Sequence, residues 1–173
     1  MMLLSRSKLA YKLGLVKPQV RLLVLCMENM CRSPLAAALI IDELKRQGAD
    51  HVVSVKSAGV SVSMVGSRPD PRVYRLAHEH DFVLCSHRSK QVLPEEFSEY
   101  DLVLAVDKQV QDRVAKEYRY QVPLFLDCLG EEGLEIPDPY YGNASGFDDV
   151  YHLSKQGAVA ITNMLLPQLK LTS

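Results

Sequence analysis

The chain has 173 residues, of which 47% are hydrophobic and 24% are charged, and its formal net charge is −1. This length and apolar content suffice for one domain with a substantial core. The balanced charge gives no general attraction to nucleic acid or to a membrane surface. No stretch approaches the roughly 18 consecutive apolar residues that a transmembrane helix requires.

The N-terminal segment, residues 1–19, contains four basic residues and no acidic one. Its apolar residues come singly and in pairs, so the segment does not resemble a secretory signal. We interpret it as a disordered or weakly docked extension; the alternative is a helix that lies on a membrane surface. Four irregularly spaced cysteines in a chain without an export signal predict reduced thiols and a cytoplasmic location.

The first half of the remaining chain begins with an apolar strand. Residues 20–25 form an apolar run of strand length, which predicts a buried parallel strand, and residues 26–33 are expected to form a loop. Pro34 then marks the start of a helix rich in leucine and alanine, which Gly48 closes. Residues 51–56 alternate enough in polarity to predict a second strand.

Further strands and helices follow in alternation. Asp70 is placed to cap a helix that has Pro71 in its first turn. Residues 101–106 predict another buried strand, and Asp107 is placed to cap the helix after it. Residues 120–124 predict a fourth strand.

The last part of the chain is a loop followed by a long helix. Residues 130–146 are rich in glycine and proline and predict a surface loop, and residues 147–169 predict the final helix. Strands that alternate with helices predict a single α/β domain over residues 20–173. We expect a four-stranded parallel sheet with helices on both faces. Because ligands of such sheets bind beyond the carboxyl ends of the strands, the site is expected after the first strand.

The loop between the first strand and the first helix contains a Cys-x5-Arg-Ser pattern, Cys26 to Ser33. A loop that enters a helix N-terminus directs several backbone N–H groups to one point, and such a nest binds an oxyanion. The same field favours the thiolate form of a cysteine. Arg32 can hold two phosphate oxygens with its planar guanidinium, and the Ser33 hydroxyl can donate to the Cys26 sulfur. The pattern therefore predicts a phosphate-binding loop that carries a nucleophilic cysteine.

Several segments together resemble the low-molecular-weight protein-tyrosine phosphatases. The loop resembles the signature of this family, and the resemblance continues in four further segments over about residues 20–170. These are Ser57-Ala58-Gly59, Asp70-Pro71-Arg72, Ser86-His87-Arg88 with Gln91, and Asp138-Pro139-Tyr140-Tyr141-Gly142. The resemblance implies hydrolysis of phosphotyrosine through a cysteinyl-phosphate, with Cys26 as the nucleophile and Arg32 as the phosphate clamp.

The resemblance also implies that Asp138 is the general acid. Protonation of the departing oxygen by a carboxylic acid is typically worth about 10²–10⁴-fold in rate. Asp138 stands between Pro137 and Pro139, which stiffen the backbone around it. The residues alone favour a turn aspartate in a proline-rich loop over a catalytic one. In the second step, the family comparison makes it the base that activates water.

Other residues receive supporting and binding roles from the same resemblance. In the family, an asparagine of the loop is held by a serine and a histidine, which are matched here by Asn29, Ser57 and His87. The expected substrate-binding residues are Met27, Glu28, Asn29, Met30, Cys31, Ser33, Met64, Tyr140 and Tyr141.

The remaining cysteines suggest one further hypothesis. Cys31 lies five residues after Cys26, so it is placed to capture an oxidised Cys26 as a reversible disulfide. Cys85 and Cys128 lie beside apolar segments, and we interpret them as core residues.

The sequence departs from the family at Glu28, where glycine is usual. We expect the glutamate side chain to point outward, leaving its backbone N–H to face phosphate. A carboxylate directed at the phosphate would instead weaken binding, which gives the alternative of a catalytically weak or silent phosphate-binding relative. The family's usual aromatic residue near Ser63 is also missing, and we expect Met64 to form that apolar wall.

Two other enzymes of the same fold are less consistent with the residues. Arsenate reductases use an additional cysteine pair, and no cysteine follows Cys85 within ten residues; arginine phosphatases tend to have a small hydroxyl residue where this chain has Met30. We therefore expect a protein-tyrosine phosphatase whose partner is a phosphotyrosine-containing protein, with tyrosine kinases among the candidates. No nucleic acid partner is expected, because the charge is balanced. No metal or other cofactor is expected, because Arg32 and the loop backbone take the place of a cation and nothing resembles a metal-ligand cluster.

Overall fold

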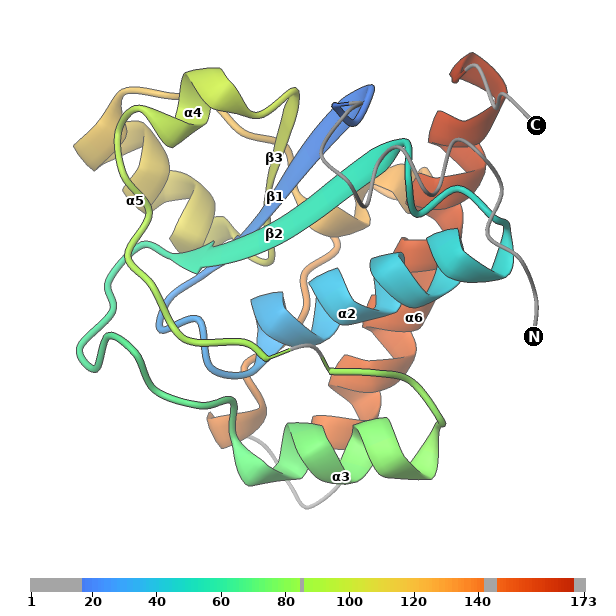
Figure 1. The fold of residues 1–173 in the computed structure, drawn as a ribbon. Coiled ribbons are helices and arrows are strands. Elements are labelled where there is room, and N and C mark those ends of the chain that lie inside the picture. Colours follow the sequence, from blue (N-terminus) through green and yellow to red (C-terminus); the bar gives the residue numbers. More distant parts are fainter. Residues whose placement is uncertain (1–16, 85, 142–145, 170–173) are drawn as a thin grey trace.

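The computed structural model describes residues 17–84, 86–141 and 146–169, which form a parallel sheet covered by helices (Figure 1). Strands β1 (Val20–Cys26), β2 (Val53–Gly59) and β3 (Leu102–Ala105) are hydrogen-bonded in the order β2-β1-β3. Both strand pairs are parallel. Strand β1 lies in the centre, where residues 22–25 are completely buried, as its continuous apolar run predicts.

The predicted fourth strand is wrong: the sheet of the described residues has three strands. Residues 120–124 do lie beside β3, but they form only one isolated bridge, between Ala105 and Leu124. In it the Ala105 N–H donates to the Pro123 carbonyl at 3.0 Å. Because proline has no N–H, the ladder cannot continue through Pro123, and the chain turns instead into the 3-10 helix Phe125–Leu129.

Helices α2 (Arg32–Arg46) and α6 (Gly146–Leu165) pack against each other on one side of the sheet (Figure 1). On the other side lie α4 (Glu96–Glu99) and α5 (Lys108–Tyr118). Helix α2 begins at Arg32, two residues earlier than predicted. Pro34 is tolerated at the third position because the N–H groups of the first turn have no partner within the helix.

The two predicted helix caps are confirmed. The Asp70 side chain accepts from the Arg72 N–H at 2.9 Å at the start of α3 (Pro71–Glu79). The Asp107 side chain accepts from the Val110 N–H at 2.8 Å at the start of α5. Both caps satisfy an N–H group that the helix itself leaves unpaired.

The last helix ends slightly earlier than predicted, at Leu165, and a short 3-10 helix follows (Leu166–Gln168). Gly157 lets α6 approach Phe125, which is completely buried: a Cβ atom at this position would lie 2.4 Å from the Phe125 ring. No helix within the described ranges is long and apolar enough to cross a membrane. A third 3-10 helix, Pro139–Tyr141, shares a cavity with Cys26 at the end of β1 and Arg32 at the start of α2.

Candidate active site

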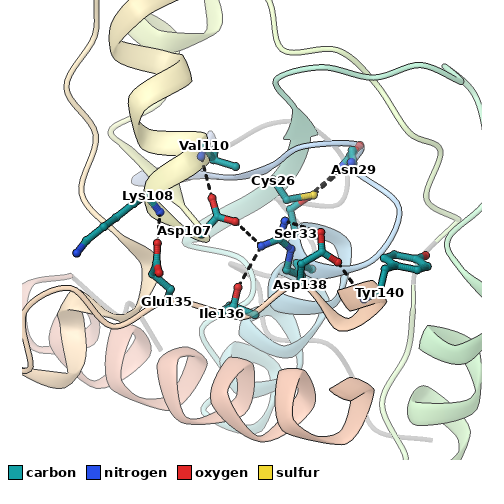
Figure 2. Close-up of polar contacts among 11 residues, drawn as sticks. Cys26, Asn29, Ser33, Asp107, Lys108, Val110, Glu135, Ile136, Asp138 and Tyr140 are labelled. Carbon is teal, nitrogen blue, oxygen red and sulfur yellow. Dashed lines mark hydrogen bonds and ion pairs between the residues drawn. The ribbon is translucent and has the colours of Figure 1, made fainter. Parts of the chain in front are cut away.

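Cys26 is the last residue of β1, and its side chain is buried at the start of the phosphate loop (Figure 2). The Asn29 N–H donates to its sulfur at 3.2 Å, and the Ser33 hydroxyl lies 2.9 Å from it. The Ser33 oxygen also accepts from the Asn29 amide at 2.9 Å, and its hydroxyl can donate to the sulfur when this is a thiolate, which can only accept. Gly59, opposite Cys26 in the sheet, has no room for a side chain because a Cβ would lie 2.5 Å from the Met27 carbonyl oxygen.

The phosphate loop is held by the completely buried side chain of Asn29. The backbone of Asn29 is left-handed, with φ at 58°, a conformation that asparagine adopts more readily than most residues. Its amide group donates to Ser57 Oγ at 3.0 Å as well as to Ser33, and its side-chain oxygen accepts from the Lys90 N–H at 3.0 Å. His87 Nε2 donates to its carbonyl oxygen at 2.8 Å. Ser57 and His87 therefore both contact Asn29, and their role in supporting the loop stays a prediction.

Arg32 is 5% exposed and lies at the first position of α2. Its Nη1 donates to Asp107 Oδ2 at 2.5 Å and to the Ile136 carbonyl at 3.1 Å, and its Nη2 lies 3.6 Å from Asp138 Oδ2. Burial alone lowers the pKa of the guanidinium, but the charges of Asp107 and Cys26 outweigh burial and raise it. Arg32 is thus a permanently charged group with a fixed direction.

Asp107 is the functional residue that sequence reasoning missed, because it was predicted only as a helix cap. Its carboxylate has two roles: one oxygen caps α5 and the other binds Arg32. Its position just past β3, beside the central strand, was the signal that could have identified it. The carboxyl ends of neighbouring parallel strands meet at one edge of the sheet.

Asp138 lines the same cavity as Arg32 but comes from another loop, and 33% of its side chain is exposed. Its Oδ1 accepts from the Tyr140 N–H at 3.0 Å, which fixes the carboxylate at the start of the 3-10 helix. Two residues before Asp138, the Ile136 N–H donates to the Val106 carbonyl at 2.9 Å. The loop that carries Asp138 is therefore attached to the end of β3.

The three predicted catalytic residues line one cavity of about 320 Å³. Its lining residues are Cys26, Met27, Glu28, Met30, Cys31, Arg32, Ser63, Asp138, Pro139 and Tyr140. Met64 and Tyr141 are not among them: 65% of Met64 and 91% of Tyr141 are exposed. Their roles in substrate binding stay predictions.

Tyr140 is held at the rim by a charged pair on α3. Its hydroxyl donates to Asp70 Oδ2, and Asp70 also accepts from Nε and Nη2 of Arg72, each at 2.9 Å. The hydrogen bonds from Arg72 lower the pKa of Asp70 to about 2. Burial and the neighbouring Asp70 raise the pKa of Tyr140, so its phenol stays protonated and continues to donate.

Glu28 is tied to the loop on the other side of the cavity. Its Oε2 accepts from both the N–H and the hydroxyl of Ser63, at 2.8 and 2.9 Å. The side chain thus joins the phosphate loop to residues 61–67 while it lines the rim.

Cys31 lines the cavity next to the nucleophile and is 5% exposed. Burial, followed by the charge of Cys26, raises the pKa of its thiol far above the ordinary value, so it does not compete as a thiolate. Cys26, Cys31 and Cys128 are free thiols. Cys128 is partly buried against the core, and its thiol donates to the Phe125 carbonyl at 3.1 Å, whereas Cys85 lies outside the described residues. Redox capture by Cys31 stays a prediction.

Within the described ranges, no group of three or more histidine, cysteine or acidic side chains is arranged to hold a metal ion. The groups that converge on the cavity are a sulfur, backbone N–H donors, a guanidinium and a carboxylate. Such a set can bind a tetrahedral oxyanion, attack it and protonate a leaving oxygen.

Known proteins are similar to this chain in both sequence and fold. A family model described as low molecular weight phosphotyrosine protein phosphatase matches residues 21–170. The enzyme of that name from Sus scrofa is 32% identical over 135 residues, covering 75% of this chain and 85% of the relative. The low molecular weight protein-tyrosine-phosphatase Wzb of Salmonella typhi is 36% identical over 141 residues, covering 80% and 89%.

The fold is also similar to that of a solved phosphatase structure. Vibrio vulnificus Wzb in complex with benzylphosphonate superposes with a TM-score of 0.73 at 27% identity, covering 85% of this chain and 99% of that one. Residues 21–170, which the family model matches, include every residue that lines the cavity described above. The chain therefore belongs to the low molecular weight phosphotyrosine protein phosphatase family, and it is a cysteine-dependent protein-tyrosine phosphatase.

Proposed function

We propose that this phosphatase works through a cysteinyl-phosphate intermediate on Cys26, with Arg32 as the phosphate clamp and Asp138 as the general acid and base. The observation that carries this assignment is that the sulfur, the guanidinium and the carboxylate line one cavity. Cys26 and Arg32 are fixed by buried hydrogen bonds, and Asp138 approaches from a separate loop.

In the first step, the Cys26 thiolate attacks phosphorus and the bond from phosphorus to the tyrosyl oxygen breaks. The N–H groups of the loop and the Arg32 guanidinium balance the charge on the phosphoryl oxygens. Asp138 enters protonated and gives its proton to the departing oxygen, so the dephosphorylated tyrosine leaves as a neutral phenol. The products of this step are a cysteinyl-phosphate and an Asp138 carboxylate.

In the second step, the Asp138 carboxylate takes a proton from water, and the oxygen of that water attacks the phosphorus. The bond from sulfur to phosphorus breaks, and inorganic phosphate is released. The Ser33 hydroxyl, 2.9 Å from the sulfur, stabilises the departing thiolate by donating to it. Cys26 and Asp138 are then both returned to the states in which they began.

The rim of the cavity suits an aryl phosphate. Met27, Met30 and Pro139 supply apolar walls, and the Tyr140 ring is fixed beside them. We propose that the substrate is a tyrosine-phosphorylated protein, with tyrosine kinases among the candidates. We further propose that residues 20–173 are the catalytic domain, that the enzyme is cytoplasmic, and that it needs no metal or other cofactor. The suggested membrane contact of residues 1–19 falls largely outside the described residues.

Hydrolysis of para-nitrophenyl phosphate by the wild type, Cys26→Ser and Asp138→Asn tests the proposal. We expect an active wild type, no detectable turnover in Cys26→Ser, and a loss of about 10²–10³-fold in kcat in Asp138→Asn. Asp148→Asn, on the exposed surface of α6, is the matched control and should turn over normally. An inert wild type would favour the silent phosphate-binding alternative, and turnover by Cys26→Ser would contradict the assignment of the nucleophile.

A further inference from the structure

A second cavity, of about 450 Å³, lies along the edge strand β2 and shares no lining residue with the active-site cavity. Helix α2 contributes one wall and residues 86–90 contribute another. This volume lies in the range of small-molecule sites. Nothing in the phosphatase mechanism uses the cavity, although it lies close to the phosphate loop.

The walls of this cavity combine an apolar floor with unbalanced positive charge. Ala37, Ala38 and Val55 form part of the floor, and the exposed cations Lys56 and Arg88 lie at its border. Neither cation forms an ion pair with any residue that the structure describes, and no carboxylate lines the cavity. An apolar floor beside two cations that form no ion pair with the described residues fits a ligand with an apolar body and an anionic group.

A third cation at the border, Lys90, does not add to this charge. Its ammonium group pairs with Glu96 at 2.5 Å, and the Glu96 side chain is only 10% exposed. The attraction for an anion therefore comes from Lys56 and Arg88.

Two residues that line the cavity also hold the phosphate loop. Ser57 accepts from the Asn29 amide at 3.0 Å, and His87 Nε2 lies 2.8 Å from the Asn29 carbonyl oxygen. Because a carbonyl oxygen can only accept, Nε2 carries the hydrogen, and Nδ1 is the remaining nitrogen of a neutral ring. Burial and the charge of the neighbouring Arg88, whose Nη1 donates to the His87 carbonyl at 2.8 Å, lower the pKa of His87 and favour this neutral form. The second cavity is therefore one side chain away from the residue that shapes the phosphate site.

We propose that this cavity is an effector site for an amphipathic anion, an aromatic or acyl body bearing one carboxylate, sulfonate or phosphate group, and that its occupation strengthens phosphate binding at the active site. The binding itself is independent of the catalytic mechanism. The coupling rests on the proposed function, because it acts through the loop assigned to phosphate.

The direction of the coupling follows from the contacts. An anion beside His87 favours protonation of Nδ1, and an imidazolium donates more strongly to the Asn29 carbonyl than a neutral ring does. Hydrogen bonds in such a chain strengthen one another. A bound anion thus stabilises the arrangement of Asn29 that the phosphate site needs. By linkage, phosphate must raise the affinity for the anion by the same factor.

Anilinonaphthalene sulfonate, an aromatic monoanion, is a suitable fluorescent probe. The measurement is its dissociation constant for the folded wild type, for Lys56→Glu/Arg88→Glu, and for Lys116→Glu/Arg119→Glu as the matched surface control. We expect the first double variant to bind at least about tenfold more weakly, and the control to bind like the wild type. Saturating inorganic phosphate should tighten binding to the wild type by about fivefold, at the low end of allosteric couplings.

Three results would overturn the proposal. Equal affinity of the two double variants would show that the probe binds elsewhere. Displacement of the probe by phosphate would place it in the active-site cavity. An affinity unchanged by phosphate would remove the coupling. Because fluorescence needs no turnover, an enzyme inactive on para-nitrophenyl phosphate would contradict the proposed function and leave the binding result intact.

Discussion

The base and the rim of the active-site cavity are held in different ways. The base, residues 26–33 without the Glu28 side chain, is fixed by hydrogen bonds that converge on the completely buried Asn29. The rim, Glu28 with Ser63 and Asp138 with Tyr140, is held by contacts that reach the surface, where Arg72 is 48% exposed. Buried polar contacts are strong and little affected by salt, whereas exposed ion pairs are weak and screened. Phosphate therefore meets a preformed site, and the rest of the substrate meets walls that are easier to alter.

Removing the central residue of the base should have the largest effect. Asn29→Ala deletes the amide that bonds Ser33 and Ser57, so the loop N–H groups should no longer converge. We expect kcat for para-nitrophenyl phosphate to fall by about 10²-fold, because small misplacements of reacting groups cost this much. Steady-state kinetics and phosphate affinity are the measurements. Activity within twofold of the wild type would show that Asn29 does not organise the base.

Asp107 connects the base to the edge of the sheet, and its substitution should have the next largest effect. Asp107→Asn keeps a good cap for α5 but removes the charge that faces Arg32. We expect kcat/KM to fall by about tenfold, because hydrogen bonds between charged groups are worth roughly 1.5–3 kcal/mol. Thermal unfolding should change little, while Asp107→Ala should also lose about 1 kcal/mol of stability through the lost cap. An equal kcat/KM in Asp107→Asn and the wild type would contradict the positioning role.

The rim should respond differently. The ion pair between Asp70 and Arg72, which holds Tyr140, contributes to the stability of the fold in a way that depends on pH. The pKa of Asp70 is lowered to about 2, against an unfolded value of about 3.9, so its stabilising contribution is complete above about pH 4. That contribution is lost as pH falls through about 2. At neutral pH, Asp70→Asn should lower the free energy of unfolding by about 1 kcal/mol, after allowance for solvent screening of Arg72.

Urea unfolding at several pH values checks this expectation. The difference between wild type and Asp70→Asn should narrow as pH falls from about 4 towards 2. Glu79→Gln, which removes an exposed i,i+4 pair with Arg75, is the control and should stay within about 0.5 kcal/mol of the wild type throughout. A difference that widened in acid would have the wrong sign for a lowered pKa.

The smallest effect is expected at the other side of the rim. Glu28→Gln keeps an oxygen that can accept from Ser63 but removes one negative charge beside the phosphate. We expect KM for para-nitrophenyl phosphate to fall by about two- to threefold with kcat unchanged, because charge at a partly exposed rim acts weakly. A rise in kcat by tenfold or more would instead mean that Glu28 suppresses the chemical step.

The same division between base and rim explains what the sequence could predict. Cys26, Arg32 and Ser33 lie within one strand–loop–helix segment, so their spacing already predicts a phosphate site. Asp70 and Asp107 were predicted as caps for the same local reason. Their second contacts join residues 70 and 75 positions apart, and no local pattern encodes them.

The role of Asp138, in contrast, could not be predicted from local spacing. Its proline-rich surroundings favour an ordinary turn, and only the family resemblance assigned it a role. The missing fourth strand is a third case. Residues 120–124 have the apolar character of a strand, but the absent N–H of Pro123 limits them to one bridge. The second contacts of Asp70 and Asp107 and the role of Asp138 could not be predicted because they depend on tertiary structure. The error over the fourth strand was of another kind, because Pro123 is a local feature that the sequence already shows.

Trapping the phosphorylated enzyme tests the assignment of Cys26 as the nucleophile most directly. Para-nitrophenol leaves readily without protonation, so Asp138→Asn should slow hydrolysis of the intermediate more than its formation. Rapid acid quenching of this variant with para-nitrophenyl phosphate, followed by peptide mass mapping, should find one phosphate on Cys26. Phosphate on any other side chain would contradict the account.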